Sequence, residues 1–430
     1  MIDVREIILK NKLARKHKLL DDSPIFLKIE NDINDKNVDF SRNTFKHFDG
    51  RLVTEYKDLS AENVILLYLK SRLKAIFHVK FANRNKLMEA LFDKLRSVQN
   101  LRDLTIIRFD LKKYFYSVST QYVYEKYIAN SKISREDRDL FEDIIKHNKY
   151  CVAGLPIFNY MVELVSRDLD VAIKARIRKY GVVYYARYVD DGVIILSNYI
   201  SKTDVKKLLD DAIEEVFKSE HSDNKVMLNK TKFKVFNRRH LKTSQSFDFL
   251  GYLFSFNNKF ANLKVGMTPQ KRDKYQAKVN KLVKANYKKG DALAEETVRH
   301  IIKVHSSRVV YFAPSMKHGG VWVSKGLIAN YIKLKDYSGY MDSDTKKFLQ
   351  AIYKTAFTKI GEPAPAYLSN PRYDLYENLI SNRTMIFNEM IGASREHLLK
   401  QLDKLDVPVR PDKNYDYLVK DYLISTKSGY

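Results

Sequence analysis

Short apolar runs alternate with amphipathic stretches through the middle of the chain. Two of these runs, Val182 to Tyr188 and Val193 to Leu196, are rich in Val, Ile and Tyr, which favour strands. Asp190, Asp191 and Gly192 stand between them, and Asp-Gly between two apolar runs is a strong hairpin signal. The pattern therefore predicts a β-hairpin that carries two adjacent carboxylates at its tip.

Periodicity divides the chain into three regions. Residues 1–100 have mainly helical periodicity, residues 101–260 alternate strands with helices, and strand signals become sparse after about residue 261. Asn31 to Arg51, rich in Asn, Asp and Lys, is expected to be a loop. This organisation is typical of an α+β protein with a helical C-terminal part. The predicted helices are Val4–Leu20, Ala61–Phe77, Lys271–Lys288, Glu295–His305, Lys325–Leu334 and Thr345–Lys359.

The chain is strongly basic. Its 430 residues include 77 Lys and Arg against 52 Asp and Glu, a formal net charge of +25. A lysine-rich solvated surface would explain this charge without any partner. A polyanionic partner explains it better, because Lys and Arg contacts to phosphate supply most non-specific nucleic-acid affinity. The 29 tyrosines also offer rings on which the bases of a single strand can stack.

Cysteine usage and hydropathy bear on where the protein resides. The single cysteine, Cys151, excludes an internal disulfide framework and fits a reducing cytosol. We expect it to be a small buried side chain rather than a catalytic thiol. No run of about 18 apolar residues occurs, and the first residues lack the pattern of a signal peptide. The sequence therefore predicts a cytoplasmic protein without a membrane span.

A third acid stands at the end of another predicted strand, Ile106 to Asp110, about eighty residues before the hairpin. Hard cations such as Mg²⁺ bind carboxylates, waters and substrate phosphates. Acids at two strand ends therefore suggest a two-metal site for phosphoryl transfer. Phe115, five residues after Asp110, is placed to stack beneath a sugar and exclude a 2′-hydroxyl. An ordinary core aromatic explains its spacing equally well.

Three further segments are informative mainly through their order. Gly154 and Pro156 flank the start of a predicted helix, where Gly followed by Pro is ordinary punctuation. Lys232 follows Leu228 and Asn229 and would neutralise or protonate a departing pyrophosphate, although a solitary lysine is more commonly a solvated surface residue. The last segment, Phe249-Leu250-Gly251-Tyr252, predicts an apolar hairpin in which the glycine allows close approach of a nucleic-acid strand.

Taken in order, these segments resemble the motifs of the reverse transcriptase family. The resemblance covers residues 101–260 and implies the palm of a right-hand polymerase there. It places a fingers region at 1–100 and an α-helical C-terminal domain, which replaces or extends the thumb, at 261–430. The matching pieces are Asp110 with Phe115 (motif A), Gly154 to Pro156 (motif B), Tyr188 to Asp191 (motif C), Leu228 to Lys232 (motif D) and Phe249 to Tyr252 (primer grip).

The resemblance also implies roles for individual residues. Asp110, Asp190 and Asp191 would hold two Mg²⁺ ions, with Mn²⁺ as an alternative. The ions would activate a primer hydroxyl and stabilise the pyrophosphate that leaves from a deoxynucleotide. Phe115 matches the steric gate that favours dNTPs over rNTPs, and Lys232 matches the motif D lysine.

Other nucleotide contacts are less specific. Gly154 and Pro156 belong to the motif that touches template and nucleotide in this family. Lys80 and Arg84 are candidates to bind the incoming triphosphate from the fingers. Surface salt bridges would explain these two residues equally well.

The chain departs from the family directly after motif B. The family usually has Gln-Gly or a similar polar, small pair there, whereas this chain has Ile157 and Phe158. This departure and the Arg-Tyr-x-Asp-Asp form of motif C resemble bacterial abortive-infection and other defence-associated reverse transcriptases. The predicted activity is therefore RNA-directed DNA polymerisation in anti-phage defence, with unconventional templating or priming.

Two alternatives remain open. One is a retron-like or intron-like enzyme that copies an RNA by conventional priming, and the other is a catalytically weak nucleic-acid-binding scaffold. The expected partners are dNTPs, a template or noncoding RNA and a DNA product, and a homo-oligomer or partner protein also remains open. Priming from a tyrosine hydroxyl, for example that of Tyr430, is allowed by the sequence but is not supported by it.

Overall fold

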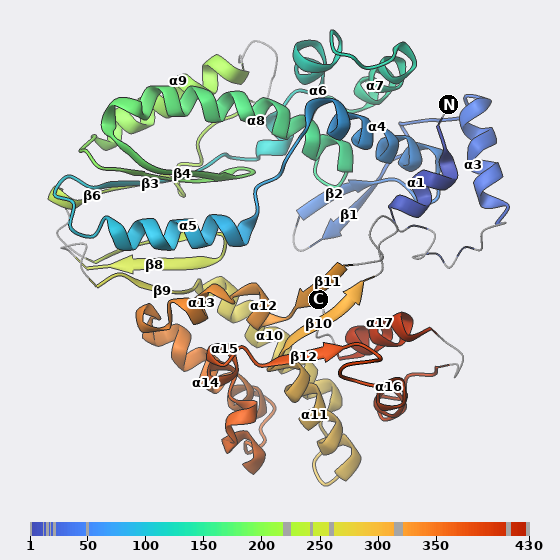
Figure 1. Ribbon diagram of the computed structural model, residues 1–430, viewed down its shortest axis with the longest axis vertical. Coiled ribbons are helices and arrows are strands. Elements are labelled where there is room, and N and C mark those ends of the chain that lie inside the picture. Colours follow the sequence, from blue (N-terminus) through green and yellow to red (C-terminus); the bar gives the residue numbers. More distant parts are fainter. Residues whose placement is uncertain are drawn as a thin grey trace. The chain divides into compact units, whose positions relative to one another are not determined.

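The computed structural model describes residues 2–11, 13, 17, 19, 23–48, 51–217, 225–240, 244–257, 262–313, 321–409 and 414–426. It is a mixture of helices and sheets, as predicted (Figure 1). The chain forms two compact units, Met1–Leu241 and Lys242–Tyr430, and each is described by itself. Residues 242–260, which the sequence groups with the preceding region, lie in the second unit.

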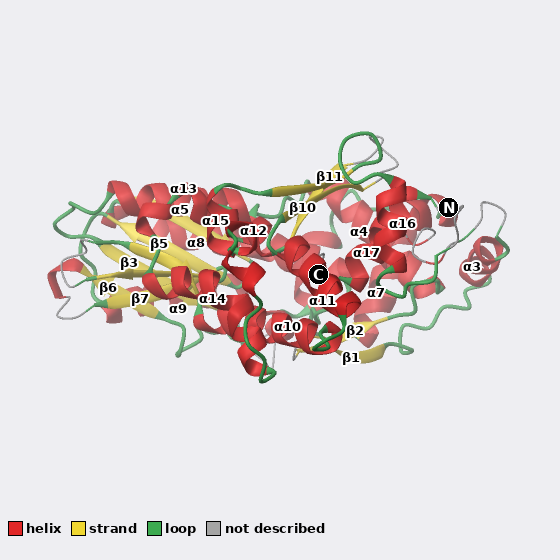
Figure 2. Cartoon of the chain, turned by 90° about the horizontal axis from the view of Figure 1, so that it is seen from below, coloured by secondary structure: helices red, strands yellow, loops and turns green. Residues whose placement is uncertain are grey.

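A four-stranded antiparallel sheet forms the centre of the first unit. Its strand order is β4-β5-β3-β6, so β3 (Thr105–Asp110) pairs with β5 (Asp191–Leu196) although a long segment separates them in sequence. The edges are β4 (Val182–Tyr188) and β6 (Lys234–Asn237). Figure 2 shows β3, β5 and β6 together in this sheet. The bounds predicted for β4 are confirmed, whereas β5 begins two residues earlier than expected.

Helices cover both faces of this sheet. In Figure 1, α8 (Pro156–Ile177) and α9 (Lys202–Phe217) lie over one face and α5 (Arg84–Ser97) lies along the other. All six residues of β3 are buried, which explains why its sequence is an apolar run rather than an alternating one. The sheet and the helices above it share one hydrophobic core.

The predicted helix Ala61–Phe77 is confirmed with the same bounds as α4. Ser60 begins it, because its side chain accepts a hydrogen bond from the Asn63 backbone N–H. Ile65 and Leu69 face the core of the sheet, whereas Val64 belongs to a second cluster. That second cluster also contains residues of α1 (Val4–Lys10) and α3 (Ile25–Asn34), so α4 joins two apolar cores.

The N-terminal hundred residues contain more strand than the sequence predicts. Asn31 to Arg51 was expected to be a loop, yet β1 (Thr44–Phe48) and β2 (Arg51–Glu55) form an antiparallel pair. The expected helix Val4–Leu20 is observed as α1, and most of the positions beyond it lie outside the described residues. The other elements of this unit are η1 (Tyr114–Ser117), α6 (Thr120–Val123), η2 (Tyr124–Ile128), α7 (Arg135–His147), η3 (Arg178–Tyr180) and η5 (Arg238–His240).

Two three-stranded sheets belong to the second unit. One has the antiparallel order β7-β8-β9, from β7 (Gln245–Phe249), β8 (Tyr252–Phe256) and β9 (Lys264–Met267). The other has the order β11-β10-β12, in which β10 is parallel to β12. The remaining elements are α10 (Pro269–Asn286), α11 (Ala292–His305), β10 (Arg308–Ala313), β11 (Val321–Lys325), α12 (Leu327–Asn330), α13 (Lys333–Asp336), η6 (Ser338–Tyr340), α14 (Ser343–Lys359), η7 (Ala366–Ser369), η8 (Pro371–Tyr373), α15 (Leu375–Ile380), β12 (Thr384–Phe387), α16 (Arg395–Asp403) and α17 (Tyr415–Ser425).

The α-helical C-terminal domain predicted for residues 261–430 is mainly helical in the described residues, but it also contains strands that were not predicted. The sheet formed by β10, β11 and β12 was missed because β10 pairs with a strand about seventy residues further on. The predicted helix Lys325–Leu334 is confirmed only in part: Lys325 ends β11, Gly326 has a φ of +98°, and the helical residues are divided between the short helices α12 and α13. Within the described part of the chain, no helix is both long enough and apolar enough to cross a membrane.

Candidate active site

The backbone brings the three predicted acids to one end of the central sheet. Asp110 is the last residue of β3 and Asp191 the first of β5, and the two stand opposite each other in the antiparallel register. Asp190 lies next to them in the β4–β5 turn, and its carbonyl accepts a hydrogen bond from the Leu111 N–H at 2.9 Å. The register of β3 and β5 thus places acids from distant parts of the sequence side by side.

The β4–β5 turn consists of Val189 and Asp190 rather than the predicted Asp-Gly pair, because Tyr188 pairs directly with Asp191. Val189 has a φ of +62°, and a positive φ at the first turn residue is typical of the type II′ hairpin, where glycine is usual. A β-branched residue in this conformation is strained by about 1–3 kcal/mol. The turn beside the acids therefore has to be held by other contacts.

Gly192 is required by packing and not by the turn. It pairs with Phe109 of β3, and a Cβ at this position would lie 2.2 Å from Cζ of the Phe109 ring. The ring of this fully buried residue covers the glycine. The Asp-Gly pair that predicted the hairpin therefore predicted it for the wrong reason.

Asp110 is held by the segment that contains Lys232. The Asn229 side chain donates a hydrogen bond to its Oδ1 at 3.0 Å, and Lys232 Nζ lies 2.7 Å from its Oδ2. Backbone hydrogen bonds from Asn229 N to Asp110 O and from Lys112 N to Met227 O fix the segment beside β3. Asp110 is buried, whereas the Lys232 side chain is half-exposed. The structure therefore brings these two predicted residues into contact.

Asp191 is paired with a buried cation that the sequence analysis missed. Arg108 Nη1 lies 2.7 Å from Asp191 Oδ1, and only 2% of the Arg108 side chain is exposed. The same nitrogen donates to the Phe109 carbonyl. Arg108 and Asp110 lie on one face of β3 because they are two residues apart in a strand. A charged residue inside an otherwise apolar strand was the signal that would have identified it.

Ion pairs with Lys232 and Arg108 hold the carboxylates of Asp110 and Asp191. Within the described residues, no group of three His, Cys, Asp or Glu side chains is placed to hold a metal ion. Lys232 and Arg108 instead supply the positive charge beside Asp110 and Asp191. The three carboxylates nonetheless have the donor chemistry that Mg²⁺ requires. Metal binding at Asp110 and Asp191 would require both side chains to exchange these cations for metal ions.

A second buried arginine holds the turn itself. Arg187 donates from Nε to Asp170 at 2.6 Å, from Nη2 to Glu163 at 3.1 Å, and from Nη1 to the Val189 carbonyl at 2.9 Å. Burial lowers the pKa of Arg187, but hydrogen bonding to Asp170 and the charges of Asp170 and Glu163 outweigh this effect and raise it. The guanidinium therefore stays charged and ties the strained turn to α8, which carries both acids.

A pocket of about 370 Å³ opens beside the turn. Phe115 and Pro156, two of the predicted nucleotide-contacting residues, line it, and Phe115 is half-buried there. At its margin, Phe81 and Tyr160 form an edge-to-face pair with ring centroids 4.9 Å apart. The pocket thus combines aromatic walls with buried charge. The other residues that line it are Lys70, Ala82, Asn159, Val162, Glu163, Arg187, Tyr188 and Val189.

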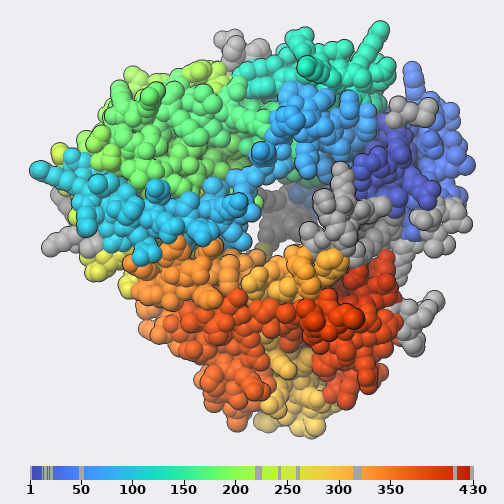
Figure 3. Space-filling model, viewed as in Figure 1, coloured from blue at the N-terminus to red at the C-terminus, as the bar shows by residue number. Residues whose placement is uncertain are grey.

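Lys80 and Arg84 are not among the residues that line this pocket. Lys80 is exposed in the segment between α4 and α5, and Arg84 is the first residue of α5, whose side chains are seen at the surface of the first unit in Figure 3. Phe81 and Ala82, which lie between them in sequence, reach the pocket instead. Triphosphate binding by Lys80 and Arg84 stays a prediction.

Gly154 has a structural reason for being glycine. Its φ is +110°, and a Cβ there would lie 2.2 Å from the Thr54 carbonyl oxygen of β2. The Thr54 N–H donates to the Ala153 carbonyl at 2.8 Å. Gly154 therefore allows β2 to pack against the start of α8, where Pro156 occupies the first turn.

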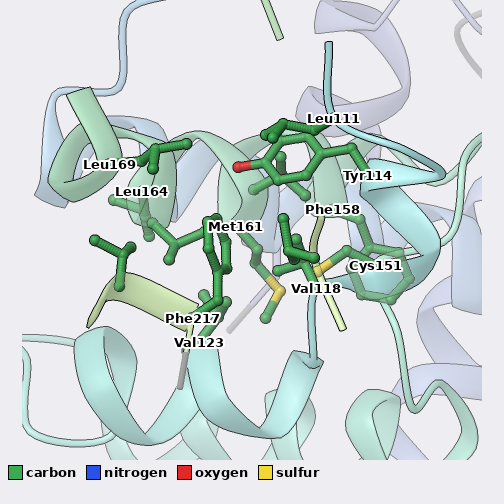
Figure 4. Packing of buried hydrophobic residues seen from close by; sticks show 14 of the residues in the cluster. Leu111, Tyr114, Val118, Val123, Cys151, Phe158, Met161, Leu164, Leu169 and Phe217 are labelled. Atoms are coloured by element: carbon green, nitrogen blue, oxygen red, sulfur yellow. The ribbon is translucent and has the colours of Figure 1, made fainter. Parts of the chain in front are cut away.

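The two residues that depart from the family motif belong to the core. Ile157 and Phe158 are fully buried, and Figure 4 shows Phe158 within the packed cluster that also contains Cys151 and Met161. Burial raises the pKa of the Cys151 thiol, so this side chain is an inert core residue, as predicted. The polar atoms on this helix that reach the pocket come instead from Asn159 onward.

Comparisons with known proteins give little further information. No protein-family model matches the chain, and no curated protein matches it in sequence. Among solved structures, telomerase from Candida albicans, in a complex with the TWJ fragment of telomeric RNA, is similar with a TM-score of 0.37 and 12% identity. The match covers 86% of this chain and 54% of that one, so the chain spans about half the length of the telomerase chain. A likeness this weak carries no argument about function.

Proposed function

We propose that the chain is a DNA polymerase of the reverse transcriptase type. The observation that supports this most is the register of β3 and β5, which sets Asp110 opposite Asp191 with Asp190 in the adjoining turn. Three carboxylates at the end of one sheet, beside a pocket with aromatic walls, suit phosphoryl transfer to a nucleotide. On this proposal residues 101–260 form the palm, residues 1–100 contribute the fingers, and residues 261–430 stand in place of a thumb.

Asp110, Asp190 and Asp191 would hold two Mg²⁺ ions, or Mn²⁺ in their place. Such ions would lower the pKa of a primer hydroxyl and stabilise the charge on the leaving pyrophosphate. Lys232 would leave Asp110 when the acids bind metal, and its half-exposed ammonium group would then neutralise the pyrophosphate. Arg108 would give up Asp191 Oδ1 to the metal but keep its hydrogen bond to the Phe109 carbonyl, so its charge would stay close enough to limit the negative charge that accumulates there.

The pocket beside the turn would hold the sugar and base of the incoming nucleotide. Phe115 forms part of its wall together with Tyr188 and Val189 of the hairpin, so a bulky ring lies close to the acid-bearing turn. As a steric gate it would select dNTPs over rNTPs. Asn159 and Glu163 would offer the polar contacts that the polar pair after motif B offers in other members of the family.

The substrate would be a nucleic acid, because the chain carries a net charge of +25. The core positions of Ile157 and Phe158 leave template handling to other residues, which supports unconventional templating or priming in a cytoplasmic defence enzyme. Copying of a cognate RNA by conventional priming is the alternative within the same chemistry. Priming from a tyrosine remains an alternative too, and Tyr430 lies outside the described residues.

The ion pairs of the acids favour a second candidate function. Because Lys232 and Arg108 already neutralise Asp110 and Asp191, a catalytically weak scaffold that binds nucleic acid is consistent with the same geometry. The two candidates differ in whether the acids exchange these cations for metal ions.

A dNTP incorporation assay in Mg²⁺ separates these candidates. Radiolabelled dNTPs are offered with and without an RNA template and primer, and the product is digested with protease to detect attached protein. The double variant Asp190→Asn, Asp191→Asn should lose incorporation by at least about a thousandfold. Asp190→Asn alone, which keeps the ion pair of Arg108 with Asp191, should lose it too while its thermal midpoint changes little. Asp143→Asn, which removes an exposed acid paired only with Lys146, is the matched control. Incorporation that survives in the double variant would overturn the proposal.

The steric gate has its own readout. Phe115→Val should raise the use of rNTPs relative to dNTPs, because it removes the ring from the pocket wall. Phe81→Val, which removes a ring from the same pocket, controls for general loss of packing. An unchanged ratio of rNTP to dNTP use in Phe115→Val would show that Phe115 has only a structural role.

A further inference from the structure

The second unit carries a concentrated strip of positive charge on one helix. Residues 269–289, which contain α10, include seven Lys and one Arg against a single Asp, a net charge of +7. This is more than half of the +13 that Lys242–Tyr430 carries from 31 basic and 18 acidic residues. The charge of this unit is therefore gathered on one short segment rather than spread evenly.

The basic residues face outward because the opposite side of α10 is core. Val279, Leu282 and Val283 are buried, and the Gln276 side chain donates to the Ile352 carbonyl of α14. The exposed positions recur every three or four residues and so form one stripe along the helix. We call it the lysine stripe; its members are Lys271, Lys274, Lys281 and Lys284 on α10, and Lys288 two residues beyond the end of the helix.

Few acids neutralise this stripe. Nearby, Asp344 lies 3.6 Å from Arg272 and Glu362 lies 3.4 Å from Lys289. Among the residues that the structure describes, no carboxylate forms an ion pair with Lys271, Lys281, Lys284 or Lys288. Clustered like charges repel one another, so this arrangement is favoured when an external polyanion is bound.

A hollow lies at the C-terminal end of the stripe. It has a volume of about 430 Å³ and is lined by three lysines, Lys284, Lys289 and Lys359, together with Tyr287, Ile360 and Glu362. Lys284 belongs both to the stripe and to this hollow. The positive surface therefore continues from α10 onto the end of α14, which contributes Lys359.

We propose that the lysine stripe and this hollow bind the phosphate backbone of a nucleic acid. From Lys271 to Lys284 the helical part of the stripe spans roughly 20 Å at the helical rise, enough for several consecutive phosphates. An anionic membrane is the other polyanion to consider. A helix that lies on a membrane exposes a large apolar face, whereas the apolar face of α10 is packed within the unit and no large hydrophobic residue is exposed between Pro269 and Asn286. The surface therefore suits phosphodiesters better than lipid.

This inference does not depend on the polymerase chemistry, because it concerns binding alone. The test uses the full chain and a fluorescein-labelled single strand, in DNA and RNA forms, of about twenty nucleotides. Anisotropy gives the dissociation constant at several salt concentrations without any dNTP. The variant replaces Lys271, Lys281, Lys284 and Lys288 by Gln. The matched control replaces four exposed lysines elsewhere in the unit, Lys264, Lys303, Lys347 and Lys420, by Gln.

The slope of log affinity against log salt should become less negative by up to about 3 in the stripe variant, because each lost phosphate contact removes about 0.7 for a single strand. The control variant should change it by less than about 1. Equal slopes in the two variants would overturn the proposal. Loss of binding to phosphatidylserine vesicles with unchanged nucleic-acid binding would also overturn it, in favour of a membrane surface. The assay contains no dNTP and does not measure incorporation, so failure of the polymerase proposal would leave this result standing.

Discussion

Two tight hairpins whose turns the structure describes, β4–β5 and β7–β8, reverse the chain in different ways. The β7–β8 turn consists of Leu250 and Gly251 at φ values of +50° and +83°, the type I′ geometry that matches strand twist, with glycine where it is preferred. The β4–β5 turn uses Val189 at +62° followed by Asp190. The first turn has glycine at one of its two positive-φ positions, although Leu250 at the other carries a cost of about 1–2 kcal/mol. The second is strained and depends on contacts from outside.

The β4–β5 turn is held by hydrogen bonds from residues outside the turn. Arg187 holds the Val189 carbonyl, and the Leu111 N–H holds the Asp190 carbonyl. At the β7–β8 turn, the Tyr331 hydroxyl donates to the Gly251 carbonyl at 3.2 Å, which adds to a turn that already has glycine at one position. A turn fixed from both sides keeps the carboxylate of Asp190 in one place. The strain at Val189 therefore accompanies positional control of an acid, as at other functional sites.

The largest expected effect follows from removing the arginine. Arg187→Met should lower the free energy of unfolding by about 3–5 kcal/mol, because Glu163 and Asp170 remain as partly buried acids without a counter-charge. Chemical denaturation measures it. Arg176→Met, which removes an arginine paired with the exposed Glu215, should cost less than about 1 kcal/mol. Similar losses in both variants would show that the clamp on the turn is no stronger than a surface pair.

Packing beside the turn gives the next effect. Gly192→Ala should lower the free energy of unfolding by about 1–3 kcal/mol, because the new methyl group overlaps the Phe109 ring. Gly339→Ala is the control, since nothing lies within 4 Å of a Cβ at that position. Thermal denaturation of the two variants measures the difference. A Gly192→Ala protein as stable as the control would mean that β3 and β5 adjust freely.

Because Val189 is strained, we expect glycine to stabilise the protein more than alanine does at this position, which reverses the usual order. At most positions glycine is less stable than alanine by about 0.5–1 kcal/mol. At position 189, Val189→Gly should be more stable than Val189→Ala by about 1 kcal/mol, because only glycine adopts a positive φ without cost. Urea denaturation midpoints of the two variants test this. If Val189→Ala were more stable than Val189→Gly, the turn would not be strained.

The smallest effect on stability is expected at the β7–β8 hairpin. Tyr331→Phe removes the hydroxyl that donates to the Gly251 carbonyl and should lower the free energy of unfolding by about 0.5–1.5 kcal/mol. Denaturation in urea measures it, with Tyr311→Phe on β10 as a tyrosine control of the same unit. A loss as large as that of Arg187→Met would remove the distinction between the two turns.

Local sequence predicted those elements whose causes are local. The helix α4 has an N-cap at Ser60 and a clear periodicity, and its bounds were predicted correctly. The strand β4 was also predicted correctly, but the turn after it was not. Gly192 is required by the close packing of Phe109 across the sheet and not by its neighbours in sequence. The strand β12 was missed for the same reason, since its partner β10 is remote in sequence. The electrostatic partners Arg108 and Arg187 were missed because a linear pattern does not reveal which charges meet.

The pairing of Asp110 with Asp191 also governs when the site comes into being. No fragment that ends before β5 contains the site, and a one-residue slip of β5 against β3 would send every side chain of β5 to the opposite face. The long helix α8 lies between the two strands in sequence, so it has to be synthesised before they can meet. During synthesis the acids therefore stay apart until most of the first unit has left the ribosome. The assembled site is thus a late product of folding and a sensitive reporter of whether the central sheet has formed in its native register.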